Sequence, residues 1–198
     1  MKFKLFAVLI LVVSLVAGCQ IIDNFVLDVK EIAKGLSGTI QTYDEESNII
    51  DRVTGNSIAF QANSEFMKSN SDGSFTGTVL EATVGGKRMI HIGSTLLFYE
   101  DGVENIFEEY AQTVDVENHD RAIPFINQMV NQLESKFLGM DQVILIRSQS
   151  GKPLATFAGD HVSVESMEVD KMSKITIDKK RIYIYRADYT IYETSLLQ

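Results

Sequence analysis

The stretch IYIYRADYTIYE, residues 182–193, carries the period-two alternation that is typical of β-strands. Aromatic and β-branched residues, which favour strands, fill most of its positions. The polar residues Arg186, Asp188 and Thr190 take one side of this alternation. We therefore expect two short strands near the end of the sequence, over residues 181–186 and 189–193.

The alternation places three tyrosines, Tyr183, Tyr185 and Tyr189, on one side of this stretch, together with Ala187 and Ile191. Two interpretations follow. An exposed tyrosine face would stack on the sugars of a wall polymer, whereas a buried one would pack in the core with its hydroxyls at the rim. The residues alone leave both open, so Tyr183, Tyr185 and Tyr189 are a candidate binding face.

Further runs of the same type precede this stretch and are separated by turn residues. Gly85-Gly86 has the composition of a two-residue hairpin turn, and Asp178-Lys179 and residues 149–152 also favour turns. Polar residues 62–74 predict an exposed loop. The other expected strands are residues 39–43, 49–53, 57–61, 75–84, 87–92, 95–99, 143–147, 154–158, 161–164 and 174–177.

Two helices are expected between the two groups of strands. Asp101 and Glu104 form a capping pattern ahead of apolar residues that share one helical face, which predicts a helix through Tyr110. A longer helix is expected to have Pro124 in its first turn and to end at Gly139.

A third helix is expected over residues 21–34, with a one-sided apolar stripe. We expect it to pack on the domain rather than on a membrane surface, because its charges sum to −1 and membrane-surface helices are usually basic. The order of strands, helices and strands predicts an α+β fold of mostly antiparallel sheet, with two central helices and this short N-terminal helix, preceded by a leader segment.

The first residues have the layout of a secretory signal. Lys2 and Lys4 precede an apolar run over residues 5–16, and small residues follow it. The run has about a dozen residues, fewer than the roughly 20 that a membrane-spanning helix requires. A cleaved signal therefore explains this segment better than a transmembrane helix does.

The apolar run stops at the only cysteine of the chain, in LVVSLVAGCQ at residues 11–20. Residues 16–19 (VAGC) resemble a bacterial lipobox. The resemblance implies cleavage between Gly18 and Cys19 and a diacylglyceryl group on the Cys19 thiol; the alternative is a chance cysteine after an ordinary signal peptide. Two acyl chains anchor a protein stably, whereas one does so only marginally.

The expected organisation has three parts: a signal peptide over residues 1–18, a lipidated juxtamembrane segment over 19–36, and one extracytoplasmic domain over 37–198. Cleavage removes Lys2 and Lys4, which leaves 16 basic and 27 acidic residues and a formal charge of −11. So acidic a chain is not expected to bind nucleic acid. The expected location is the outer face of the cell membrane, through diacylglyceryl-Cys19.

The sequence offers two candidates for catalysis, each a histidine beside an aspartate. His119 and Asp120 precede the long helix, where a capping role is the simpler interpretation. Asp160, His161 and Ser163 are close in sequence, but nucleophilic triads are assembled by geometry and usually from distant positions.

The remaining titratable groups also favour structural roles. His91, between two isoleucines, fits a satisfied position in a sheet. The acidic runs 44–46 and 108–109 lack the spacing of a calcium loop and are expected to be solvated faces. We therefore expect no catalytic residue, no metal site and no cofactor.

Four segments together resemble a known family: IQTYDEESNIIDRVTGNSI (40–58), TVDVENHDRAIPFINQMVN (113–131), ILIRSQSGKPLATFAGD (144–160) and IYRADYTIYETSLL (184–197). They resemble uncharacterised lipoproteins of low-GC Gram-positive bacteria, catalogued as a domain of unknown function. The resemblance spans nearly the whole chain and implies a lipid-anchored, extracytoplasmic placement, but it brings no activity. We expect a non-enzymatic domain that binds an envelope protein or wall polymer; the alternative is an envelope- or cell-wall-directed enzyme.

Overall fold

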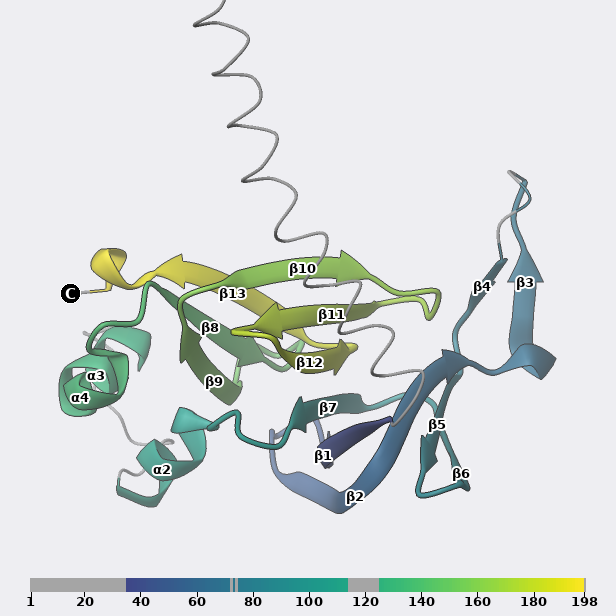
Figure 1. Cartoon of the computed structure of the whole chain (residues 1–198), viewed down its shortest axis with the longest axis horizontal. Coiled ribbons are helices and arrows are strands. Elements are labelled where there is room, and N and C mark those ends of the chain that lie inside the picture. The colour runs from purple at the N-terminus through teal and green to yellow at the C-terminus, as the bar shows by residue number, and fades with distance from the viewer. Residues whose placement is uncertain (1–34, 72, 74, 114–124, 198) are drawn as a thin grey trace, which may run out of the picture.

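The computed structural model describes residues 35–71, 73, 75–113 and 125–197 (Figure 1). The predicted signal peptide, Cys19, the helix expected over residues 21–34 and the pair His119 and Asp120 lie outside these ranges. Within them the chain is mostly antiparallel sheet with few helices, which confirms the coarse prediction.

Strands make up most of the described chain: β1 (Leu36–Tyr43), β2 (Ile49–Ala62), β3 (Met67–Ser69), β4 (Phe75–Gly77), β5 (Leu80–Val84), β6 (Lys87–His91), β7 (Thr95–Glu100), β8 (Gln142–Arg147), β9 (Pro153–Gly159), β10 (Val162–Ser166), β11 (Met172–Ile177), β12 (Lys180–Tyr185) and β13 (Asp188–Glu193). The helices are α2 (Ile106–Thr113), α3 (Phe125–Gln132) and α4 (Glu134–Phe137). Two short 3-10 helices are η1 (Ser64–Phe66) and η2 (Thr194–Leu196).

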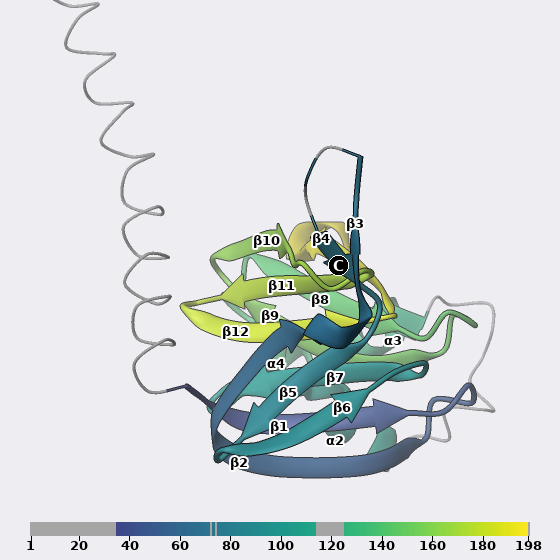
Figure 2. The same ribbon diagram turned by 90° about the vertical axis from the view of Figure 1, so that its right-hand side faces the viewer.

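Strand β7 lies inside an eight-stranded antiparallel sheet with the order β10-β11-β12-β7-β1-β2-β5-β6. It pairs with β1, from the start of the described chain, and with β12, from near its end. A three-stranded sheet, β13-β8-β9, lies against one face, with the helices beside it (Figure 1). The β3–β4 hairpin projects from the opposite end of the molecule (Figures 1 and 2).

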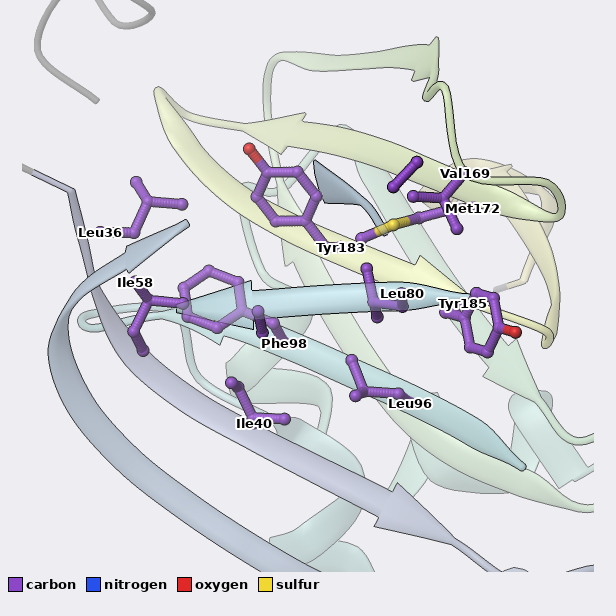
Figure 3. Packing of buried hydrophobic residues seen from close by; sticks show 12 residues of the cluster. Leu36, Ile40, Ile58, Leu80, Leu96, Phe98, Val169, Met172, Tyr183 and Tyr185 are labelled. Atoms are coloured by element: carbon purple, nitrogen blue, oxygen red, sulfur yellow. The ribbon is translucent and has the colours of Figure 1, made fainter. Parts of the chain in front are cut away.

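The eight-stranded sheet curls so that its two halves share one core. Phe60 on β2 packs against Phe98 on β7 and Tyr183 on β12, with ring centroids 5.3 and 4.9 Å apart. Two strands separate β2 from β12 in the sheet, so only strong curvature brings these rings together. Figure 3 shows this cluster, whose buried members include Leu36, Ile40, Ile58, Leu80, Leu96, Phe98, Val169, Met172, Tyr183 and Tyr185.

Two further clusters hold the layers together. One lies between the two sheets and includes Leu97, Ile144 and Phe157. The other lies between the three-stranded sheet and the helices and includes Tyr110 and Met129. The molecule therefore has three layers: the curled sheet, the three-stranded sheet and the helices.

Strand β12 shows why this sequence needs a layer on each side. Ile182 and Ile184 face the three-stranded sheet, whereas Tyr183 and Tyr185 face the core of the curled sheet. All four side chains are buried. Because full burial of a large apolar side chain stabilises a fold by roughly 1.5–3 kcal/mol, both faces of this strand contribute to stability.

The strand boundaries differ from the prediction at β2, which is one strand where two were expected. Gly55 lies at the expected gap, and a Cβ at this position would come within 2.6 Å of Val84 Cγ1. The glycine therefore allows β5 to approach β2 and does not end the strand. The Gly85-Gly86 turn is confirmed, with φ of 56° and 78° and β5 paired to β6 around it.

The loop expected over residues 62–74 is wrong in part, since this segment contains η1 and β3. Asn63 is fully buried, accepts a hydrogen bond from the Glu65 N–H at 3.0 Å and donates one to Glu81 Oε2 at 2.8 Å. The strand expected over 75–84 is divided into β4 and β5 just after Gly77, whose backbone bonds Glu168 and Asp170.

The helices also differ from the prediction. Helix α2 begins at Ile106, after Asn105, rather than near Asp101. The long helix is interrupted at Leu133, which adopts φ −111° and ψ 37° and separates α3 from α4. Lys136 on α4 forms ion pairs with Glu104, just before α2, and with Glu109 on α2, so α4 contacts α2 directly.

Candidate functional site

The structure does not place the three candidate tyrosines on one exposed face. Tyr183 and Tyr185 are each 1% exposed and lie in the core of the curled sheet (Figure 3). Tyr189 lies on β13, in the other sheet, and packs against the cluster between the sheets. The chain crosses between sheets at Arg186, whose φ is 56°, so the alternation is not continuous. The expected binding face is therefore wrong, and the core interpretation agrees with the burial.

Asp160 and His161 line one cleft, with a volume of about 600 Å³, between the start of β8 and η2. The His161 side chain is 81% exposed, and its Nδ1 lies 3.5 Å from Oδ1 of Asp178. Asp160 accepts a hydrogen bond from the Asp141 N–H at 3.2 Å. The structure thus brings the candidate pair to one cleft but gives the imidazole a different carboxylate partner. Ser163 lies on β10, paired with Thr176 of β11.

His91 has the structural role that the sequence predicts. Its Nε2 lies 2.8 Å from the Ser94 carbonyl oxygen, and its ring packs edge-on against Tyr185. In the described part of the chain, no group of three or more His, Cys, Asp or Glu side chains is arranged to hold a metal ion. Of the candidates that the structure describes, only Asp160 and His161 line a cleft in which they could act on a ligand.

A larger and more apolar hollow lies beside α2, and we call it the α2 groove. It has a volume of about 850 Å³ and lies between α2, the β1–β2 turn and the β8–β9 turn. The rings of Phe107 and Phe125 meet edge to face on its wall, 5.6 Å apart. Its apolar lining is Tyr43, Ile49, Phe107, Ala111, Phe125, Pro153 and Leu154, and its charged lining is Glu46, Arg52, Glu108 and Lys152.

Glu108 organises the floor of the α2 groove. Its Oε1 accepts hydrogen bonds from Gln41 Nε2 at 2.7 Å and from Arg52 Nη2 at 3.1 Å. Longer contacts of 3.4 Å join the same oxygen to the Tyr99 hydroxyl and to Asn105 Nδ2. Gln41 is fully buried, so this network ties β1, β2, β7 and α2 together through one carboxylate.

The tyrosines of this network are held in their neutral form. Burial, with a further contribution from Glu108, raises the pKa of Tyr43 far above its ordinary value. Burial and Glu108 also raise the pKa of Tyr99. The Tyr43 hydroxyl donates to Gln41 Oε1, and that of Tyr99 donates to Glu108. Both hydroxyls therefore remain donors throughout the physiological range of pH.

Two hairpin turns close one end of the groove. Ser150 Oγ donates to the Glu45 carbonyl at 3.1 Å, and Lys152 Nζ donates to the Glu46 carbonyl at 3.4 Å. Ser47 and Ser148 also contact each other through their hydroxyls, 3.3 Å apart. On the far side of this contact is a more polar cleft of about 740 Å³ that includes Thr95 and Arg186.

The arrangement of the α2 groove suits binding. An apolar group can enter beside Phe107 and Phe125 and exchange contact with water for contact with aromatic rings. Arg52 and Lys152 at the rim offer charged donors to polar atoms of the same ligand. The floor is held in place by the Glu108 contacts, so it requires little reorganisation when a ligand binds.

The sequence does not reveal this site, because Glu108 and Glu109 have the pattern of a solvated acidic face. The buried residue that could have pointed to it is Gln41, but it stands in the run TIQTY with the polar residues Thr39 and Thr42, so the sequence does not mark it as buried. A buried amide requires hydrogen-bond partners, and in a chain of strands and helices these come from a packed neighbour. Nothing in the sequence, however, indicates that α2 is that neighbour.

Comparison with known proteins identifies a family but no relative of known activity. The model of the family described as "Domain of unknown function (DUF5052)" matches residues 1–197. No curated protein and no solved structure matches the chain. Among the residues that the structure describes, no helix has both the length and the apolar character needed to cross a membrane.

Proposed function

Because the chain belongs to the family DUF5052, whose description assigns no activity, we propose a function from the α2 groove and the leader. The protein is a lipoprotein held on the outer face of the cell membrane by a diacylglyceryl group on Cys19. Its domain binds an envelope protein in the α2 groove and catalyses no reaction. The groove is the single observation that carries the binding proposal.

The dimensions and lining of the groove favour a protein segment over a wall polymer. Its volume of about 850 Å³ lies within the range of ordinary ligand sites, roughly 300–1,000 Å³. Ile49 on the wall is 42% exposed, and Ala111 on α2 is exposed as well. Apolar and aromatic walls with a few charges at the rim are typical of sites that take apolar side chains of a protein partner.

The experiment that tests this proposal uses the full chain as bait against solubilised cell envelope. An arginine in place of Ala111 would fill the groove from an exposed helical position, so Ala111→Arg should lose the captured partner. Ala59→Arg, at an exposed position on β2 away from the groove lining, is the matched control and should retain it. Equal capture by both variants would contradict the groove as the binding site, and captured glycan in place of protein would redirect the proposal to wall polymer.

A second candidate, an enzyme acting on an envelope substrate, is favoured by one observation. Asp160 and His161 line the same cleft, and the imidazole has a carboxylate partner in Asp178. A histidine oriented by a carboxylate is a common general base. The test compares release of fragments from purified wall material by the wild-type chain and by His161→Gln. Release that requires His161 would support the enzyme, and no release by the wild type would exclude it for that substrate.

A further inference from the structure

One long edge of the eight-stranded sheet is open beside the α2 groove. Strand β2 pairs with β1 along most of its length but with β5 only from Ala59 to Ala62. Within the described ranges, no strand pairs with the outer side of β2 from Ile49 to Gly55. Figure 2 shows β2 along the lower border of the molecule, outside β1. Such an edge is a template for another strand.

The direction of the backbone groups on this edge follows from β1. The Ser37 carbonyl accepts a hydrogen bond from the Asp101 N–H, so Ser37 faces β7, as do Thr39 and Gln41 two and four residues later. The residues between them, such as Ile40, face β2 and bond to their register partners, such as Val53.

Arg52 and Thr54 lie opposite Gln41 and Thr39, so they turn their N–H and C=O groups away from β1, toward the open side. Asn56 agrees with this assignment, because its carbonyl accepts the Gly85 N–H on that same outer side. Two independent contacts therefore point to outward donors and acceptors at Arg52 and Thr54. Both residues lie in the part of β2 whose side chains are mostly exposed.

The protein treats a neighbouring edge differently. The outer edge of β9 lies beside α2, and there Asn105 Oδ1 accepts the Thr156 N–H at 3.1 Å, in a buried contact. A side chain that occupies a strand edge in this way prevents another strand from adding to it. The contrast shows that the same region of the molecule blocks one edge and leaves the other open.

A second copy of the chain fits this edge poorly. Two antiparallel copies of β2 related by a two-fold axis place one residue opposite itself. An axis at Ile50 leaves only the first residues of β2 to pair. An axis at Asp51 or Arg52 brings like charges together, which is destabilising. An axis at Val53 or beyond brings the second copy against the β5–β6 turn, which bonds Asn56. A single extended segment of another protein avoids these conflicts.

The surroundings give the chemistry of such an occupant. Ile49 and Ile50, at the start of the edge, are 42% and 56% exposed. The nearby charges are mainly acidic: Asp44, Glu45, Glu46 and Asp51 stand against Lys152, and Arg52 is paired to Glu108. Ile49 and Arg52 belong both to this edge and to the lining of the α2 groove.

We propose that an extended segment of a partner protein, with apolar and basic residues, adds to the outer edge of β2 between Ile49 and Gly55 and places apolar side chains in the α2 groove. The inference rests on the proposed binding function of that groove and names its ligand class. Backbone groups of Arg52 and Thr54 supply the affinity, and the groove selects the side chains.

The test begins with a display library of random twelve-residue peptides selected on the full chain. Peptides enriched in alternating apolar and basic residues are expected. Thr54→Pro removes the outward N–H but no bond to β1, and proline is tolerated on an open edge. Thr54→Val keeps the N–H and is the matched control. Binding should fall about tenfold or more in Thr54→Pro, as expected for a lost backbone pair, and remain in Thr54→Val.

Amide hydrogen exchange gives a second readout that needs no variant. Binding should slow exchange at Arg52 and Thr54 in the wild-type chain. Equal peptide binding by Thr54→Pro and Thr54→Val with unchanged exchange at these amides would overturn the strand addition, as would a library without binders. Loss of binding in Ala111→Arg alone would keep the groove and overturn only the strand. Loss in Thr54→Pro but not in Ala111→Arg would keep the strand and overturn the groove.

Discussion

Arg52 on β2 and Glu108 on α2, which both line the α2 groove, form an ion pair with 3.1 Å between Nη2 and Oε1. The same oxygen accepts the amide of the fully buried Gln41. The Glu108 carboxylate therefore makes two contacts of unequal importance for stability. The exposed ion pair with Arg52 contributes little, whereas the buried Gln41 amide needs Glu108 as an acceptor.

Glu108→Ala should destabilise the protein more than Arg52→Ala does. Loss of the carboxylate removes the stronger acceptor of the buried Gln41 amide and leaves only its longer contact with the Tyr99 hydroxyl, 3.3 Å, which costs about 1–3 kcal/mol. Loss of Arg52 removes a partly exposed ion pair worth up to about 1 kcal/mol. Urea unfolding followed by circular dichroism measures both. Glu109→Ala, which removes an exposed partner of Lys136, is the control, and the opposite order of the first two variants would contradict the role given to Glu108.

Tyr185→Ala should cost about 3–5 kcal/mol of unfolding free energy, because it leaves a cavity in the core of the curled sheet. Tyr185→Phe keeps the ring and removes only the hydrogen bond from its hydroxyl to the Thr78 carbonyl, 2.8 Å long, so about 1 kcal/mol is expected. Thermal or urea unfolding distinguishes the two. Similar small losses in both variants would show that the ring is not packed as the structure places it.

Stability should decline above about pH 10, where free tyrosine ionises. The pKa of Tyr43 is raised in the folded protein, first by burial and then by Glu108, so the unfolded chain loses its proton at a lower pH than the folded one. The stabilisation is complete below the unfolded pKa and falls as the pH rises past it. Urea midpoints between pH 8 and 11 should fall less steeply in Tyr43→Phe than in the wild type. Identical slopes would exclude this contribution.

Cys19→Ala should move the protein from the detergent phase to the aqueous phase when cells are extracted and the phases separated. The reason is that the substitution removes the thiol that would carry the diacylglyceryl group, and with it the membrane affinity of two acyl chains. Ser14→Ala, within the apolar run, is the control and should leave the protein in the detergent phase. Unchanged partition of Cys19→Ala would refute the lipid anchor.

The sequence predicted most strands of this fold because alternation and turn residues are local signals. The β8–β9 hairpin and the β11–β12 hairpin around Asp178-Lys179 lie where the pattern places them. Alternation could not show that β12 is covered on both faces. The curvature that buries Tyr183 and Tyr185 comes from strands β2 and β7, which are distant in sequence.

The candidate site was harder to predict for the same reason. Phe107 and Phe125 lie on α2 and α3, Ile49 starts β2, and Leu154 lies on β9. Each of these residues has an ordinary local pattern, and only tertiary packing brings them to one groove. The predicted bounds of the long helix were wrong because the helix is interrupted at Leu133, within a continuous apolar stripe. Helix propensity does not indicate this interruption.

The position of β7 in the sheet also constrains when the chain can complete its fold during synthesis. The ladder of β7 is completed only by residues 182–185 of β12, which are synthesised long after it. An emerging polypeptide therefore lacks one neighbour of its central strand until nearly all of it has been made. Folding that depends on such remote pairings is slow and cooperative. Under the export that we propose, such slow folding would leave time for translocation before the core forms.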